Sequence, residues 1–237
     1  MAQKLKKVPT PYIDEAIEPS PLVEPGEELS PLASEPRGEF ASVASRILMK
    51  VLYATRMARF DFLRPVSFLA QRVTKWDEFC DRLLHRLMCY VNSTLDLAMT
   101  GWCGDKDTGR FALSILCDTD YARCTDTARS TTGAYRALVG PHSFLPLVGI
   151  SKSQAAASHS TKVAELAAAD RGGRVEGLPA VTLWNVLLKR NVDLVLCGSK
   201  ESAALAIETG RNPTMRHILR TRKVEFAFLH ELLAGAP

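Results

Sequence analysis

The chain has 237 residues, 46% of them hydrophobic, so it is long enough to bury a real core in one large domain or two small ones. Its formal net charge of +4 is unevenly distributed. Residues 1–39 carry four basic and eight acidic side chains, a charge of −4, which leaves +8 on the remaining 198 residues. A modestly basic body suits a polyanionic partner but does not require one.

The six cysteines form no C-x-x-C pair, and no set of ligands has the spacing of a zinc site, so free thiols in a reducing compartment are expected. The Lys-rich start runs into Pro9 and Pro11 instead of an apolar stretch. No run approaches the ~18 apolar residues that cross a bilayer. We therefore expect an intracellular protein of the cytoplasm or nucleus, with no signal peptide and no membrane partner.

The first 38 residues hold seven of the thirteen prolines, with many Glu and Ser and few large apolar side chains. Such a segment buries too little surface to offset the entropy lost on ordering. We predict a disordered leader over residues 1–39.

A helical segment is predicted over residues 40–104. The first helix, from about Phe40, has an apolar stripe at three- and four-residue spacing. It is made of Val43, Ile47, Val51 and Ala54, and Leu48 and Leu52 widen it. A second helix is expected after Pro65, a favoured first-turn residue. A third is expected from about Trp76 to Val91, burying Phe79, Leu83, Leu84, Leu87 and Met88.

The pattern of residues 105–237 changes to short apolar runs between turn residues, which predicts strands. The expected strands are 111–117, 133–139, 144–150 and 192–197, and Pro146 marks the third as an edge or bulged strand. Helices are expected from Ser160, whose hydroxyl can act as a cap, to Ala169, then at 179–190, 201–208 and 224–233, with a break at Gly172-Gly173. This order predicts an α/β fold, a mixed sheet with helices on both sides.

Two motifs in this part resemble a known family. The stretch Cys117-Asp118-Thr119-Asp120-Tyr121-Ala122 is followed by Arg129-Ser130-Thr131-Thr132-Gly133. They resemble the ribonuclease H domain of copia-type LTR retrotransposon polyproteins, which typically read S-D-A-D-W-A-G and then R-x-S-T-S-G. The resemblance implies a ribonuclease H-like fold.

The helical segment resembles the part of the same polyprotein that follows the polymerase palm. The family reads L-Y-L-A-x-x-T-R-P-D-I and later R-Y-L-x-G-T-x-x-x-G-L, and here residues 52–62 and 89–97 are similar. Phe60 stands in place of Pro, and Ser93 in place of Gly. The resemblance covers about residues 40–233, and there is no polymerase carboxylate pair of the Y-V-D-D kind.

The resemblance implies phosphodiester hydrolysis of an RNA–DNA hybrid by two Mg²⁺ ions, held by acids at four positions. Asp118 matches the first position, with Asp120 as the alternative, Glu165 matches the helix position, and Glu225 matches the last. Each of these acids has a plainer interpretation, as a turn residue for Asp118, a solvent-facing helical residue for Glu165, or a residue favoured by a helix dipole for Glu225.

The third position, where the family reads Y-C-D-N-Q-S-A, is Gly198, which supplies no side-chain oxygen. We therefore expect an intact fold with weak or absent cleavage. Asp193 or Glu201 could substitute in an active enzyme, and a non-catalytic module that binds nucleic acid or protein is the third possibility. A basic run, Arg216, Arg220, Arg222 and Lys223, could follow a phosphate backbone. The polymerase domains of the same polyprotein are a further expected partner.

Overall fold

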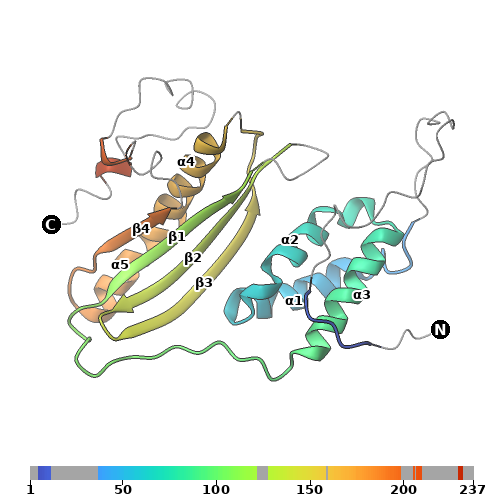
Figure 1. Ribbon diagram of the computed structural model, residues 1–237, viewed down its shortest axis with the longest axis horizontal. Helices are drawn as coiled ribbons and strands as arrows, with labels where there is room; N and C mark the ends of the chain where they lie inside the picture. Colours follow the sequence, from blue (N-terminus) through green and yellow to red (C-terminus); the bar gives the residue numbers. More distant parts are fainter. Residues whose placement is uncertain are drawn as a thin grey trace. The chain divides into compact units, whose positions relative to one another are not determined.

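The computed structural model describes residues 5–11, 37–121, 128–158 and 160–198, with residues 205, 207–209 and 229–231. The chain divides into two compact units, residues 1–98 and 99–237, which are taken one at a time below (Figure 1). Of the predicted leader, residues 1–4 and 12–36 lie outside the described part. No helix within the described ranges is long and apolar enough to cross a membrane.

The first unit is helical, as the sequence predicts. Its elements are α1 (Ala44–Met57), η1 (Phe60–Phe62), α2 (Leu63–Gln71), η2 (Val73–Lys75) and α3 (Glu78–Ser93). The predicted second helix begins two residues before Pro65, which therefore lies in its first turn. α3 begins after Asp77, whose carboxylate accepts a hydrogen bond from the Cys80 amide at 2.7 Å.

The buried side of α1 agrees with the predicted stripe at Leu48, but its centre is rotated by about one residue. Ala44, Leu48 and Thr55 are buried, while Ile47 and Val51 are only partly buried against the core. Thr55 can be buried because its hydroxyl donates to the Val51 carbonyl at 2.7 Å, which satisfies the polar group inside its own helix. The spacing of apolar residues alone could not predict that Thr55 is buried and Ala54 is exposed.

The two described ends of the predicted leader contact α3. The Lys6 amide donates to the Cys89 sulfur at 3.4 Å and the Val8 amide to the Ser93 hydroxyl at 3.1 Å. At the other end, the Glu39 amide donates to the Asp81 carboxylate at 2.5 Å. These residues therefore belong to the helical unit.

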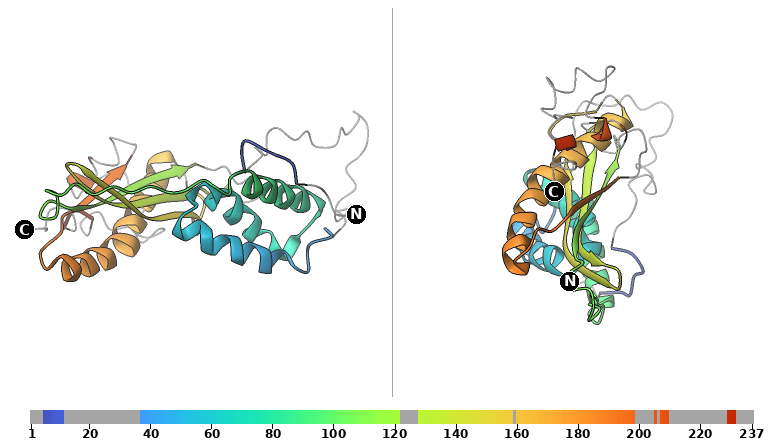
Figure 2. Two further views of the ribbon diagram at one scale, coloured as in Figure 1. Left: turned by 90° about the horizontal axis from the view of Figure 1, so that it is seen from below. Right: turned by 90° about the vertical axis from the view of Figure 1, so that its left-hand side faces the viewer.

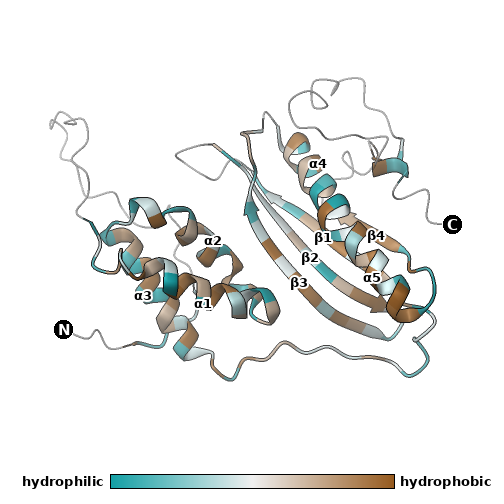
Figure 3. Cartoon of the chain, turned by 180° about the vertical axis from the view of Figure 1, so that it is seen from behind, coloured by the Kyte–Doolittle hydropathy of each residue, from teal (hydrophilic) through white to brown (hydrophobic). Residues whose placement is uncertain are grey.

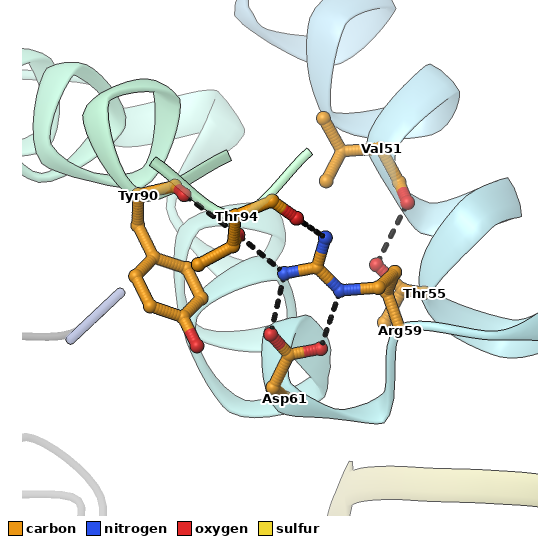
Figure 4. Close-up of polar contacts among 6 residues, drawn as sticks. All are labelled: Val51, Thr55, Arg59, Asp61, Tyr90 and Thr94. Carbon is orange, nitrogen blue, oxygen red and sulfur yellow. Dashed lines mark hydrogen bonds and ion pairs between the residues drawn. The ribbon is translucent and has the colours of Figure 1, made fainter. Parts of the chain in front are cut away.

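A polar cluster around Arg59 joins the ends of α1 and α3 (Figure 4). The guanidinium binds the Asp61 carboxylate through two nitrogens, at 2.7 and 3.0 Å. It also donates to the carbonyl and hydroxyl oxygens of Thr94 at 2.9 and 2.7 Å, and it lies over the Phe62 ring. A bidentate pair of this kind is strong because both bonds are charge-assisted. The two family-like segments of this unit, 52–62 and 89–97, are thus held together by one arginine.

The second unit is built on a four-stranded mixed sheet. The strands are β1 (Ala112–Asp120), β2 (Thr131–Gly140), β3 (Ser143–Ser153) and β4 (Leu194–Gly198), in the order β3-β2-β1-β4. The pairs β1–β2 and β2–β3 are antiparallel, whereas β1 and β4 are parallel. All four strands are at the predicted places. Pro146 lies at a register shift beside Arg136 and Ala137, which agrees with the predicted bulge.

One long helical run covers one face of this sheet: α4 (Thr161–Arg171), a π-helix (Gly172–Gly177) and α5 (Leu178–Leu188) (Figure 1, Figure 2). The Ser160 hydroxyl accepts from the Val163 amide at 3.3 Å, which confirms the predicted cap. The helices predicted at 201–208 and 224–233 lie largely outside the described residues. The prediction that helices cover both faces of the sheet is therefore described for one face only.

The predicted break at Gly172-Gly173 is wrong, because the helical run continues through both glycines. A Cβ on Gly172 would collide with the Cys117 sulfur of β1, and one on Gly177 would lie 3.1 Å from the Ile115 side chain. The glycines therefore allow close approach to the strand, and they do not end the helix. Ile115, Cys117 and Ala168 form the buried core here.

Most residues of α5 are apolar (Figure 3). Its inner side packs against Phe111 and Leu113, while Leu183, Val186 and Leu187 remain exposed.

The Gly/Asp-rich segment before β1 is fixed to the β2–β3 turn by Asp107. Its buried carboxylate accepts from the His142 amide at 2.6 Å and the Ser143 hydroxyl at 2.7 Å. Burial alone would raise the pKa of Asp107, but these hydrogen bonds outweigh it and hold the pKa below the ordinary value. This contact fixes the entry into β1.

Gly172→Ala tests the helix–strand contact. Glycine to alanine within a helix normally stabilises a protein by ~0.5–1 kcal/mol. Here we expect a loss of about 1–3 kcal/mol in the free energy of unfolding, because the added methyl collides with Cys117. Urea denaturation measures the difference. Gly109→Ala is the matched control, since nothing lies within 4 Å of its Cβ position, and it should change stability by less than ~0.5 kcal/mol.

Candidate functional site

The ends of β1 and β4 and the first half of α4 meet at one end of the sheet. Cys117 pairs with Gly198 across the parallel strands, so Asp118 directly follows the residue that faces Gly198. The Thr119 hydroxyl donates to the Ala164 carbonyl at 3.3 Å, which brings the residue before Glu165 to the end of β1. The backbone at positions 118, 165 and 198, which resemble three metal-ligand positions of the family, therefore converges at this end of the sheet.

Glu165 is buried, with 4% of its surface exposed, on the α4 side of the sheet. Glu165 lies near enough to Cys117 of β1 to affect its titration. Burial first, and then nearby negative groups that include Glu165, raise the pKa of the Cys117 thiol to about 12. The predicted alternative of a solvent-facing Glu165 does not hold.

Asp118 lies on the other side of β1. Side chains alternate along a strand, and the buried Cys117 and the α4-bound Thr119 both point toward the helix. Asp118, between them, is exposed, and Asp120 follows the same alternation. The strand therefore separates Asp118 from Glu165.

Gly198 lies on the α4 side, opposite Cys117, and no atom of the described residues lies within 4 Å of its Cβ position. The described part of the chain therefore leaves room for a larger side chain there. Asp193, a possible substitute ligand, is five residues earlier and so roughly 16 Å along β4. Its carbonyl accepts from the Leu113 amide near the opposite end of β1.

The other predicted residues of the site lie outside the described part of the chain. These are the last acid, the second possible substitute and the basic run: Glu225, Glu201, Arg216, Arg220, Arg222 and Lys223.

Among the described residues, the arrangement of Asp118 and Glu165 does not fit a site for two Mg²⁺ ions. Such ions lie ~3.5–4 Å apart and share oxygen ligands. Asp118 and Glu165 occupy opposite faces of β1, and Gly198 offers no oxygen. Among the described residues, no group of three His, Cys, Asp or Glu side chains could hold a metal ion.

A buried hydrogen-bond network, missed from the sequence, holds the start of α4 against the strands. The Gln154 amide donates to the Thr132 hydroxyl of β2 at 3.1 Å and to the Ala164 carbonyl of α4 at 3.0 Å. Its own oxygen accepts from the Ser158 hydroxyl at 3.1 Å. A single Gln before a run of alanines gives no local signal, because its partners come from two distant elements.

Comparisons of the chain with protein-family models, with curated proteins and with solved structures found no match.

Thiol labelling measures how tightly α4 packs on β1. Cys117 is buried with a pKa of about 12, so at pH 8 only roughly one molecule in ten thousand carries the reactive thiolate. Cys103 and Cys197 are exposed. We expect iodoacetamide at pH 8 to modify Cys103 and Cys197 in the folded chain and to leave Cys117 intact, by peptide mass spectrometry. All three should react in guanidinium. Equal rates for Cys117 and Cys103 in the folded chain would contradict the packing described.

Proposed function

We propose that residues 99–237 are a ribonuclease H-like domain of a copia-type retrotransposon polyprotein, which binds RNA–DNA hybrid and cleaves it weakly or not at all. The observation that carries this proposal is the convergence of positions 118, 165 and 198. Residues far apart in the sequence that resemble the family's metal positions come to one end of the sheet. Motif similarity alone does not require this convergence.

The strand arrangement supports the same proposal. Three antiparallel strands in chain order, then a helical run, then a fourth strand parallel to the first, agree with what the resemblance implies for this domain. In the proposal, the first unit is the segment that connects this domain to the polymerase domains of the polyprotein.

Two features support impaired catalysis. Gly198 contributes no carboxylate, so less negative charge would offset the repulsion between two Mg²⁺ ions held close together. Asp118 and Glu165 also face away from each other across β1. The weak metal site proposed here would take Mg²⁺, because carboxylate oxygens are the ligands that this ion prefers.

The position of Asp193, just before β4 and far from Gly198, disfavours the rival enzyme in which Asp193 replaces the lost acid. Glu201, the other candidate for that role, lies outside the described residues. A module that binds hybrid but never cleaves it remains close to our proposal, and the two differ only in residual activity.

Gly198→Asp tests the proposal, because its carboxylate would fill open space beside Cys117, on the same face as Glu165. We expect the wild-type chain to show no Mg²⁺-dependent cleavage of a labelled hybrid above that of Asp118→Asn. Gly198→Asp should raise Mg²⁺ affinity roughly tenfold or more, since a unit charge ~4 Å away contributes up to about 4 kcal/mol near a protein surface. Calorimetric titration with Mg²⁺ measures the gain, and Gly198→Asn is the isosteric control without charge.

Efficient cleavage by the unmodified chain, abolished by Asp118→Asn or Glu165→Gln, would overturn the impairment. Equal Mg²⁺ affinities for Gly198→Asp and Gly198→Asn would mean that position 198 is not a metal position. Hybrid binding is followed separately by fluorescence anisotropy, and it should weaken as salt rises.

A further inference from the structure

The outer face of α1 carries basic and bulky side chains side by side. Counted along the helix at 100° per residue, the members of this face fall within one third of its circumference. All of them are exposed: Arg46, Met49, Lys50, Tyr53 and Met57, with Arg56 at the edge. Tyr53 is 76% exposed, far more than the aromatic rings of the core beneath it.

Every charged residue of this face is basic. α1 contains three basic residues and no acidic one. Within the described part of the chain, no ion pair joins Arg46, Lys50 or Arg56 to a carboxylate. Arg59, just after the helix, differs because Asp61 and Thr94 hold it. The three cations of α1 are therefore available to an external anion.

We propose that this face of α1 binds single-stranded nucleic acid. Arg46 and Lys50 would contact successive phosphates, and the Tyr53 ring would stack on a base. This interaction goes beyond the function proposed for residues 99–237, because it uses the other unit and a different nucleic acid.

The combination of groups favours a single strand over a duplex. Protein grooves that bind single strands combine cations along the backbone with aromatic rings on which bases stack. In a duplex the base faces are already stacked on each other, so an exposed Tyr53 would have no ring to meet. Arg46 and Lys50 are four residues apart, or about 6 Å along the helix, and Tyr53 follows within one turn of Lys50.

The test uses the full chain and a fluorescein-labelled oligo(dT) longer than the ~4–16 nucleotides of a typical site, with anisotropy measured across a salt series. Tyr53→Ala should weaken binding about tenfold, because one stacked base is lost, while Tyr53→Phe should retain the affinity. Arg46→Gln with Lys50→Gln should reduce the slope of log affinity against log salt by about 1.4, since each phosphate contact on a single strand contributes ~0.7. Lys75→Gln, at an exposed lysine off this face, is the matched control and should leave both quantities unchanged.

Three results would overturn the inference. One is wild-type affinity in Tyr53→Ala. Another is an unchanged salt slope in the Arg46/Lys50 double variant. The third is equal competition by polyglutamate, which has charge but no bases. Hybrid cleavage and hybrid binding by residues 99–237 are measured with Asp118 and Glu165 variants, so failure of one proposal is distinguishable from failure of the other.

Discussion

The close approach of the helical run α4–π–α5 to β1 is the constraint on which the second unit depends. Gly172 lies where any side chain would collide with Cys117, so the backbone of the run passes directly over the strand. That contact sets the depth of α4 and buries Glu165 beside the end of β1. The Gln154 network then fixes the first turn of α4 against β2. The candidate site is therefore a consequence of packing, because these contacts of apolar and neutral polar groups bring α4 to the end of β1.

Much of the fold could be predicted from the sequence, because periodicity and turn residues are local signals. The three helices of the first unit and the four strands of the second are at the predicted places, and Ser160 caps α4 as predicted. The failures arise where a specific contact, which spacing does not record, decides the outcome. Gly172 and Gly173 normally favour a helix end, but here the neighbouring strand requires their small size. Thr55 is buried in place of Ala54 because its hydroxyl finds a carbonyl in its own helix.

The location of the candidate site on the fold could be predicted from the sequence, but the directions of its side chains could not. The family resemblance indicated positions 118, 165 and 198. The register of β1 with β4 brings 118 and 198 together, and the hydrogen bond from Thr119 to Ala164 brings the residue before Glu165 to the same place. Spacing carries no information on which face of a strand a side chain occupies. The alternation of side chains along β1 places Cys117 and Thr119 toward α4 and Asp118 away from it. Asp118 is therefore on the opposite face of the strand from Glu165. A cluster such as Arg59, Asp61 and Thr94 is likewise visible only once α1 and α3 are packed.

A crystal structure of the wild-type chain grown with Mn²⁺, phased near the manganese absorption edge, tests the central claim most directly. Manganese prefers the same oxygen ligands as magnesium and is located by its anomalous signal. We predict that the β3-β2-β1-β4 order is retained, with Glu165 buried on the α4 side and with no pair of ions at the ends of β1 and β4. Two manganese ions ~3.5–4 Å apart, ligated by both Asp118 and Glu165, would contradict the account.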